Sequence, residues 1–379
     1  MHVETPDVTA VDDQVRAELR RSGAMSFARF MELCLYSPKI GYYETHSRTI
    51  GRTGDYFTNV SVGEVFGQLL AAQIAEWFLD IPPRAIPEQA PPTLVEAGAH
   101  DGRLALDILT ALRERAPDLY ARLRYVVVEP SDGRQRWQRE TLAPHADRLI
   151  QVSTLGELAP FHGVFVCNEL LDAFPVHRFG WNRARRLWEE IGVMEAVGGL
   201  AWSRLERPSF SFEEEAARAG FSFPAALLEV LPDGYIVELN PKAAEWWAGM
   251  GGRLASGVMV AVDYGLPASE WIQPGRSEGT TRAYSEHRVS DDLLAMPGRQ
   301  DLTAHVNFTA IERTGLAVGL TTAGLSRQSE FLTRIVQRAE QGGRGFGWGA
   351  AQLRQFQTLV HPAHLGHSFR VLVQKRDIA

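Results

Sequence analysis

Two acidic residues and two glycines stand where a strand-based nucleotide site would need them. Glu96 ends a short apolar run, Gly98 and Gly102 follow it, and Glu129 ends the next apolar run. At the carboxyl ends of parallel strands, glycine lets the backbone approach a ligand, and a carboxylate accepts hydrogen bonds from ribose hydroxyls. The pattern predicts a ribose-containing cofactor held by Glu96, Gly98, Gly102 and Glu129, with Leu104 at the start of the following helix. A tight turn without a ligand and a solvated strand end are the alternatives.

The residues inside this glycine turn indicate which cofactor it binds. His100 and Asp101 occupy the turn, whereas a dinucleotide pyrophosphate requires an uncluttered turn that offers backbone N–H groups to an anion. An acidic side chain repels pyrophosphate and suits a positively charged sulfonium. The turn therefore favours S-adenosylmethionine over a nicotinamide nucleotide.

A third polar group follows the apolar run at 163–168, in the order Asn-Glu-Leu-Leu-Asp-Ala-Phe-Pro. Asn168 and Glu169 would project from the end of a strand into the same crevice. Glu169 and Asp172 would lie near one another if a helical turn follows. The alternative is an ordinary helix start whose acidic residues complement the helix dipole.

Short apolar runs that alternate with a helical pattern must position these residues. Strands are predicted at 93–96, 125–129, 149–152, 163–168, 257–264 and 369–373, and an amphipathic helix at 104–115. Such alternation is typical of a parallel sheet covered on both faces. The predicted fold class is α/β, with a doubly wound, Rossmann-like core.

Segments on either side of these strands divide the chain. Residues 1–90 are expected to form an N-terminal helical segment with a cofactor-covering loop, and residues 91–175 the first part of the core. Residues 176–256 exceed a normal crossover and are expected to form an inserted lid or substrate-binding subdomain, and residues 257–379 the remainder of the core with C-terminal helices. In the first segment, Ser26 is predicted to cap one helix, and Ser61 with Glu64 to form the capping box of a second.

Composition limits the class of protein. A formal net charge of −7 argues against a nucleic-acid partner, and two cysteines provide neither a disulfide framework nor a Cys-rich metal site. Neither a secretion signal nor a membrane span is evident, so we expect a cytoplasmic protein without a membrane partner or a metal.

Several blocks, in order along most of the chain, resemble one methyltransferase family. The sequence is similar to the MidA-type proteins, the family of the mitochondrial complex I assembly factor that methylates a protein arginine. The blocks that carry the resemblance are residues 26–31, 35–38, 41–43, 54–58, 66–67, 168–176, 263–265, 282–284 and 297–308.

The resemblance implies a class I methyltransferase core that uses S-adenosylmethionine. It implies that Gly54, Asp55 and Thr58 help to close the cofactor site, and that Asn168, Glu169 and Asp172 face the reacting centre. Asp301 and His305 would shape the substrate pocket, with a purely structural role for His305 as the alternative. On this basis we expect Glu169 and Asp172 to hold a guanidinium group of the acceptor.

The chain departs from the family pattern at two places. His100 stands where the family has a glycine, and Asn59-Val60-Ser61 stand where it has Ser-Pro-Glu. Three functions are therefore weighed: methylation of an arginine or another nitrogen in a protein or peptide, O- or N-methylation of a small molecule enclosed by the Trp-rich insert, and a non-catalytic assembly protein. The oligomeric state stays open, a homodimer included.

Overall fold

The computed structural model describes residues 10–45, 58–82, 90–285 and 288–377. The chain forms two compact units. The parallel-sheet unit comprises residues 48–170, 246–265 and 314–379, and the antiparallel unit comprises residues 1–47, 171–245 and 266–313. The chain therefore passes between the units several times, so that neither unit is one continuous segment.

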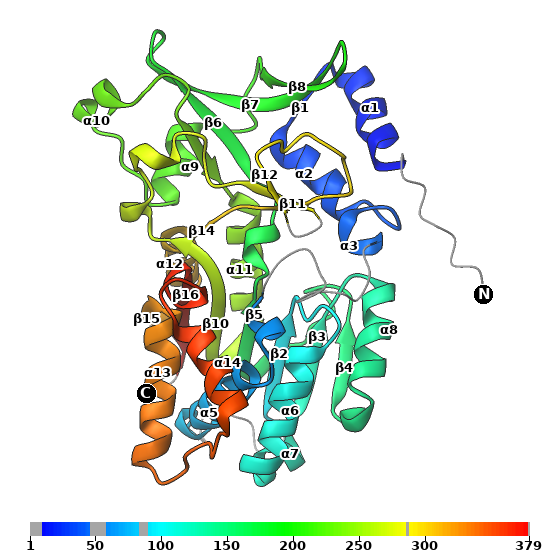
Figure 1. Ribbon diagram of the computed structural model, residues 1–379, viewed down its shortest axis with the longest axis vertical. Helices are drawn as coiled ribbons and strands as arrows, with labels where there is room; N and C mark the ends of the chain where they lie inside the picture. The colour runs from blue at the N-terminus through cyan, green and yellow to red at the C-terminus, as the bar shows by residue number, and fades with distance from the viewer. Residues whose placement is uncertain (1–9, 46–57, 83–89, 286–287, 378–379) are drawn as a thin grey trace. The chain divides into compact units, whose positions relative to one another are not determined.

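Seven strands of the parallel-sheet unit lie in the order β15-β16-β10-β5-β2-β3-β4 (Figure 1). All are parallel except β16, which is antiparallel to both β10 and β15. From β2 the chain runs outward through β3 and β4 and then returns to β5 on the other side of β2. The carboxyl ends of β2 and β5 thus form the topological switch point, where open α/β sheets bind ligands. The strands are β2 (Thr93–Ala97), β3 (Arg124–Val128), β4 (Leu149–Val152), β5 (Phe161–Asn168), β10 (Leu254–Leu266), β15 (Thr321–Arg327) and β16 (Phe369–Arg376). The predicted doubly wound α/β fold is confirmed.

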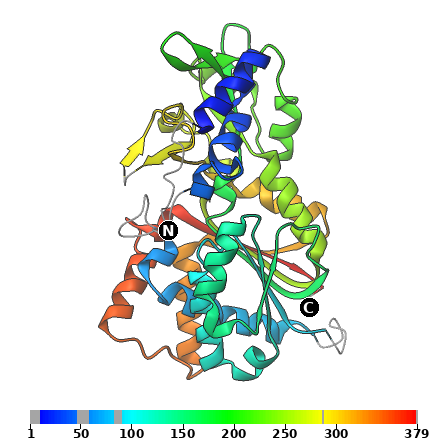
Figure 2. The same ribbon diagram turned by 90° about the vertical axis from the view of Figure 1, so that its right-hand side faces the viewer.

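Helices cover this sheet on both faces, which Figure 2 shows from a second direction. On one face, Leu94, Val164 and Val260 belong to a core with apolar residues of α5, α6 and α13. On the other face, the ring of Phe165 lies 5.7 Å from that of Trp246 and 5.9 Å from that of Trp247. Burial on both faces explains why these strands lack polar alternation. The helices of the unit are α4 (Asn59–Val62), α5 (Val65–Asp80), α6 (Arg103–Arg115), α7 (Pro117–Arg122), α8 (Asp132–Thr141), α13 (Gln328–Gln341), α14 (Ala350–Val360) and α15 (Leu365–Ser368).

The antiparallel unit contains two sheets. One has the order β1-β7-β6-β9 with β8 beside β7, and the other the order β12-β11-β13. Their strands are β1 (Ala24–Ser26), β6 (His177–Asn182), β7 (Leu187–Ala196), β8 (Gly199–Arg204), β9 (Ile236–Leu239), β11 (Arg282–Ser285), β12 (Arg288–Ser290) and β13 (Asp301–Thr303), and the short strand β14 (Val306–Asn307) follows. The helices are α1 (Ala10–Ser22), α2 (Phe27–Tyr36), α3 (Tyr42–Thr45), α9 (Phe212–Arg218) and α10 (Ala225–Val230), while α11 (Pro241–Arg253) and α12 (Phe308–Ala317) continue into the other unit.

The tryptophans of the predicted lid are mostly core residues. Trp181 is buried, and Trp188 stacks on Phe212 with ring centroids 4.4 Å apart. Trp247 is fully buried, and only Trp202 is exposed among the five tryptophans of this insert, Trp181, Trp188, Trp202, Trp246 and Trp247. The expectation that these rings enclose a planar substrate therefore loses its basis.

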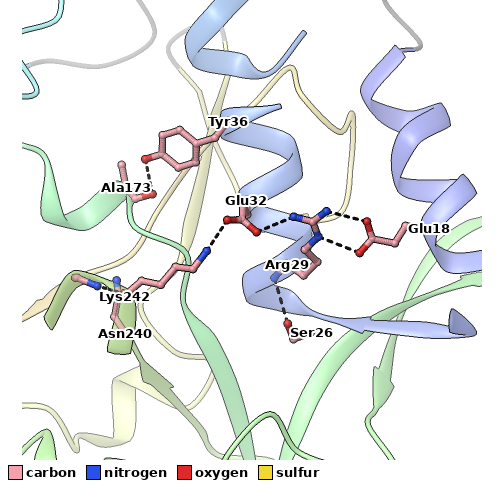
Figure 3. Close-up of polar contacts among 9 residues, drawn as sticks. Glu18, Ser26, Arg29, Glu32, Tyr36, Ala173, Asn240 and Lys242 are labelled. Atoms are coloured by element: carbon pink, nitrogen blue, oxygen red, sulfur yellow. Dashed lines mark hydrogen bonds and ion pairs between the residues drawn. The ribbon is translucent and has the colours of Figure 1, made fainter. Parts of the chain in front are cut away.

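Helix α2 is anchored at both ends and along its exposed side (Figure 3). Ser26 caps its N-terminus by accepting a hydrogen bond from the backbone N–H of Arg29, as predicted. Arg29 pairs with Glu18, and Glu32 pairs with Lys242 of α11, with shortest N–O distances of 2.9 and 2.5 Å. At the C-terminal end, the hydroxyl of Tyr36 donates to the carbonyl of Ala173 over 2.9 Å.

The second predicted helix start is wrong. The capping box joins Thr58 and Ser61 at the start of α4, and Gly63, with a φ of 135°, separates α4 from α5. Glu64 precedes α5 without a side-chain capping bond. The expected insert at 176–256 lies in the antiparallel unit as far as residue 245, and its role as a lid stays a prediction. No helix in the described ranges is long and apolar enough to cross a membrane.

Candidate active site

The glycine turn after β2 has a backbone that only small residues adopt readily. Gly98 and Gly102 have φ values of 76° and 86°. A Cβ atom at Gly98 would lie 3.1 Å from Cδ1 of Leu170, and one at Gly102 would lie 3.3 Å from Cα of Gln138. Both positions are therefore strained for any L side chain, and Gly98 brings the turn close to the segment after β5.

Glu129 is held at the end of β3 with its carboxylate already oriented. It is 4% exposed, Oε1 accepts from the backbone N–H of Ser131 over 3.0 Å, and Oε2 accepts from Nε2 of Gln138 over 3.2 Å. Nε2 of Gln138 also donates to the carbonyl of His100 over 3.0 Å. Gln138 thus connects the glycine turn with the predicted ribose-binding carboxylate.

Glu96 lies in the interior, 2% exposed, and accepts a 2.6 Å hydrogen bond from the hydroxyl of Tyr125. Burial raises the pKa of Glu96 to about 7, because the Tyr125 donor offsets only part of the desolvation. This carboxyl is therefore about half protonated near neutral pH. Leu104, predicted beside the cofactor, is a buried core residue of α6.

His100 occupies the turn in the left-handed region, with a φ of 47°. Burial lowers the pKa of its imidazole, and Nδ1 lies 3.8 Å from Oδ1 of Asp101. The ring lies 6.1 Å from that of Trp137 on α8. Burial thus favours the neutral imidazole, and the backbone takes the left-handed conformation that glycine adopts most readily.

Asn168 and Glu169 lie at the carboxyl end of β5 with a fixed set of partners. Oδ1 of Asn168 accepts from Nδ2 of Asn59, and Oε1 of Glu169 accepts both from Nδ2 of Asn168 and from the backbone N–H of Asn59, each over 3.0 Å. Nε2 of Gln328 donates to Oδ1 of Asn59 over 2.8 Å. Glu169 itself has a φ of 52°, a conformation that costs energy for a side chain of this type and is frequent at functional sites.

Asp263, on β10, fixes the next residue of this segment. Its Oδ2 accepts from the backbone N–H of Leu170 over 3.2 Å, and its Oδ1 accepts from that of Tyr264 over 2.9 Å. Since Leu170 packs on Gly98, Asp263 helps to position both sides of the switch point.

Thr58 has a clear local role. Its Oγ1 accepts from the backbone N–H of Ser61 over 3.0 Å, and Oγ of Ser61 accepts from the backbone N–H of Thr58 over 2.9 Å. A glutamate three residues after a threonine is the usual partner in such a box. Ser61 therefore completes the capping box that a glutamate at this position can also complete. The difference from the family pattern is explained by this local role without a change of substrate. Gly54 and Asp55 lie outside the described residues.

Asp172 and Asp301 lie in the antiparallel unit. Three successive carbonyl groups fix the segment of Asp172: that of Asp172 accepts from the backbone N–H of Ala304 over 3.0 Å, that of Ala173 from Tyr36, and that of Phe174 from Nδ2 of Asn240 over 3.0 Å. Only the second of these three bonds is drawn in Figure 3.

Two tyrosines accompany these aspartates. Tyr43 donates to Oδ1 of the fully buried Asp301 over 2.8 Å, and Tyr284 is the cross-strand neighbour of Asp301 in the β11–β13 ladder. Burial raises the pKa of Tyr284, and the carboxylates of Asp172 and Asp301 raise it further, against the opposing charge of Arg282. The two predicted acids and two phenols thus belong to one cluster of the antiparallel unit.

His305 lies in a different polar cluster. Its backbone N–H donates to Oγ1 of Thr280 over 3.1 Å, and burial lowers the pKa of its imidazole to about 4. A neutral ring near a buried network fits the structural alternative. The centre of that network is Glu238, whose carboxylate accepts from the backbone N–H and hydroxyl groups of Thr280 and Thr281 over 2.5 to 3.0 Å.

The parallel-sheet unit brings together most of the predicted cofactor residues and adds several that the sequence did not point to. Gln138, Asn59 and Gln328 were missed because an isolated amide side chain carries no sequence pattern. A carboxylate at the end of the second strand is the partner that ribose hydroxyls need, and Asp101, an acid inside the turn, disfavours a pyrophosphate. The donor set therefore fits S-adenosylmethionine.

Comparisons with known proteins agree with this geometry. Residues 69–326 match the model of a family described as S-adenosyl-L-methionine-dependent methyltransferases. A methyltransferase-like protein from Burkholderia thailandensis, whose crystal structure contains S-adenosyl-homocysteine, is 30% identical with a TM-score of 0.82, over 100% of this chain and 96% of that one.

Curated relatives extend the likeness. The mitochondrial protein arginine methyltransferase NDUFAF7 homolog of Drosophila melanogaster is 26% identical over 95% of this chain and 83% of its own length. Protein arginine methyltransferase NDUFAF7 of Mus musculus is 25% identical over 82% of this chain and 70% of its own length.

Proposed function

Because the chain belongs to the family of S-adenosylmethionine-dependent methyltransferases, we propose that it methylates a guanidinium nitrogen of an arginine in a protein. The observation that carries the proposal is the carboxylate of Glu169, held by two N–H donors at the switch point of the sheet. The names of the relatives from Drosophila and mouse support the same acceptor.

For this reaction the protein must mainly align the reactants and supply negative charge. S-adenosylmethionine supplies a methyl group on a positively charged sulfur, and the protein contributes alignment of the acceptor and exclusion of water. An arginine side chain is protonated at neutral pH and is a poor nucleophile. Glu169 supplies the negative charge that holds the guanidinium. It accepts the proton that the nitrogen loses as the nitrogen–carbon bond forms and the methyl–sulfur bond breaks, with S-adenosyl-homocysteine as the leaving group.

The other residues have supporting roles in this proposal. Glu129 binds the ribose hydroxyls, Gly98 and Gly102 give the backbone access to the cofactor, and Asn168 orients Glu169. Asp172 belongs to the antiparallel unit, so its sharing of one guanidinium with Glu169 stays a prediction. A cytoplasmic location also stays a prediction, supported by the free, buried thiols of Cys34 and Cys167.

The test uses a deletion strain and labelled cofactor. Purified protein is incubated with S-adenosylmethionine carrying a tritiated methyl group and the protein fraction of the deletion strain, and the products are hydrolysed in acid. Label is expected in methylated arginine, and the Glu169→Gln variant should lose about 10²- to 10⁴-fold in rate, the usual contribution of a positioned acid or base.

Two results would reject the proposal. Label released as methanol by mild base would indicate a carboxyl ester, and label confined to small molecules would indicate a metabolite as the acceptor. A Glu169→Gln variant of full activity would remove Glu169 from the reaction while leaving the acceptor open to identification by the same hydrolysis.

A further inference from the structure

Three side-chain amides of the parallel-sheet unit form a chain that ends on the carboxylate of Glu169. Gln328, the first residue of α13, donates to Oδ1 of Asn59 over 2.8 Å, Asn59 donates to Oδ1 of Asn168 over 3.0 Å, and Asn168 donates to Oε1 of Glu169 over 3.0 Å. Gln328 and Asn59 are both fully buried. Every NH₂ group in this amide chain therefore points toward Glu169.

The direction of the amide chain is set at its far end. Nε2 of Gln328 also donates to the backbone carbonyl of Leu359, over 3.0 Å. A carbonyl oxygen can only accept, so Gln328 must turn its NH₂ group toward Leu359, which also places that group toward Asn59. Oε1 of Gln328 has no hydrogen-bonding partner among the residues that the structure describes. The buried amide thus keeps this orientation although none of the described residues donates to its oxygen.

Each later amide follows from the one before it. Because Asn59 receives a donor on its oxygen, its NH₂ group faces Asn168, and Asn168 in turn presents its NH₂ group to Glu169. Reversal of any one amide would set two oxygen acceptors against each other at some point between Leu359 and Glu169, and two acceptors in contact repel.

We infer that Gln328 is a positioning residue, which acts through Asn59 and Asn168 to orient the anionic carboxylate of Glu169 toward the cationic ligands of the site. The inference rests on the proposed function, since it takes Glu169 to be the anion at the reacting centre. Asn59 replaces the family's serine at this position, so the amide chain is a feature of this sequence rather than of the family pattern.

Two ligands that differ in charge distinguish this positioning role from a general contribution of Gln328 to the stability of the fold. S-adenosylmethionine carries a cationic sulfonium, and S-adenosyl-homocysteine has the same adenosine and amino-acid groups around a neutral sulfur. An oriented carboxylate favours the first ligand, whereas a general loosening of the fold weakens both alike. The ratio of the two dissociation constants, measured by calorimetry, is therefore the readout.

The variants are Gln328→Met, which keeps the length of the side chain without its NH₂ group, and Asn59→Ser, which keeps the backbone N–H that Glu169 accepts. Each should raise the dissociation constant of S-adenosylmethionine about fivefold and that of S-adenosyl-homocysteine less than about twofold. This is the size of effect expected for one partly screened charge. The double variant should show no further change in the ratio, because either substitution already interrupts the amide chain. Glu169→Gln sets the largest change in ratio that the loss of this charge can produce.

Gln374→Met is the matched control. Gln374 is also a fully buried glutamine of this unit, where it accepts from Nε1 of Trp247 over 2.8 Å and donates to Oγ1 of Thr322 over 3.2 Å. Its loss should lower the melting temperature as Gln328→Met does and leave the ratio unchanged.

Three outcomes would overturn the inference: an unchanged ratio in Asn59→Ser, an unchanged ratio in Glu169→Gln, or additive changes in the double variant. Should Gln328→Met fail to fold, Asn59→Ser alone decides. Since the measurement contains no methyl acceptor, a failure to find methylated arginine would reject the proposed acceptor and leave this result standing.

Discussion

Each unit buries a glutamate almost completely, and the two carboxyl groups respond in opposite ways. Glu96 of the parallel-sheet unit has one phenol donor, and burial raises its pKa to about 7. Burial also acts to raise the pKa of Glu238 in the antiparallel unit, but the charge of Arg178 and the four threonine donors outweigh it and lower the pKa below its usual value.

The difference shows that burial alone does not decide the charge of a carboxyl group. Arg178, itself buried, has Nη1 3.4 Å from Oε1 of Glu238 and lies over the rings of Phe27 and Trp202 at 5.5 and 5.0 Å. A carboxylate that is matched in charge and in hydrogen bonds stays ionised inside the protein. The antiparallel unit therefore depends on a buried ion pair, whereas Glu96 has no such counter-charge and burial favours its protonated form.

The largest expected effect is on the antiparallel unit. Glu238→Gln leaves the buried guanidinium of Arg178 without its counter-charge, and the free energy of unfolding should fall by about 3 to 5 kcal/mol. Urea unfolding at pH 7 measures it. The matched variant Glu96→Gln should not lose stability at pH 7 and should gain up to about 3 kcal/mol, since a neutral amide avoids the cost of ionising a buried carboxyl. Equal losses in the two variants would contradict the comparison.

The next effect concerns Glu129, the carboxylate that we propose as the partner of the ribose hydroxyls of the cofactor. Glu129→Ala should raise the dissociation constant of S-adenosyl-homocysteine roughly 100-fold, the equivalent of about 3 kcal/mol for two charge-assisted hydrogen bonds to ribose. Calorimetry measures it. Gln151→Ala, whose side chain reaches the Glu129 carboxylate through Gln138, should cost roughly fivefold in the same affinity. Unchanged affinity in Glu129→Ala would remove Glu129 from the cofactor site.

A pH series sharpens the comparison because the two glutamates act with opposite sign. The folded pKa of Glu96 is raised, so its contribution is fully present below pH 4.5 and is lost as the pH rises toward about 7. The loss amounts to roughly 3 kcal/mol over that interval. The folded pKa of Glu238 is lowered, so its contribution is present above pH 4.5 and is lost as the pH falls through the folded pKa.

Urea unfolding between pH 3 and pH 8, roughly the range over which these carboxyl groups titrate, measures both contributions. Relative to the native protein, Glu96→Gln should flatten the curve between about pH 5 and 7, and Glu238→Gln should flatten it below about pH 4.5. A curve for Glu96→Gln that parallels the native one throughout would show that this carboxyl ionises as it does in the unfolded chain.

The smallest effect tests the capping box of the parallel-sheet unit. Ser61→Glu should leave the stability within about 0.5 kcal/mol of the native value, because a glutamate also accepts from the N–H of the cap, while Ser61→Ala should cost about 1 kcal/mol. Thermal unfolding measures both. If Ser61→Glu altered the labelled product instead, the residue would belong to acceptor recognition.

Short sequence patterns predict most strands of the parallel sheet and the glycine turn after β2. The strand at 149–152 was predicted with its observed bounds, the cap at Ser26 formed as expected, and Gly98 and Gly102 have the positive φ that such turns need. These features depend on a few neighbouring residues. The strand β15 was missed because its side chains are largely exposed and carry no apolar run.

Contacts between residues that are far apart in the sequence could not be predicted from such short patterns. Gln328 and Asn59 are 269 positions apart, and neither type of side chain indicates a partner. Ser61 pairs with Thr58 rather than with Glu64 because α4 ends at Gly63. The sequence alone allows both capping boxes, Thr58 with Ser61 and Ser61 with Glu64, and does not decide between them. The assembly of the antiparallel unit from three segments likewise has no signal in any one of them.

The position of β16 has a consequence for synthesis of the protein. This strand follows β15 in the chain but lies between β15 and β10 in the sheet, so the edge of β10 on that side lacks its partner until β16 has left the ribosome. Every segment of the antiparallel unit is made before then. A nascent chain would therefore expose an apolar strand edge for a time, and chaperones that bind such edges would act on this half-finished sheet.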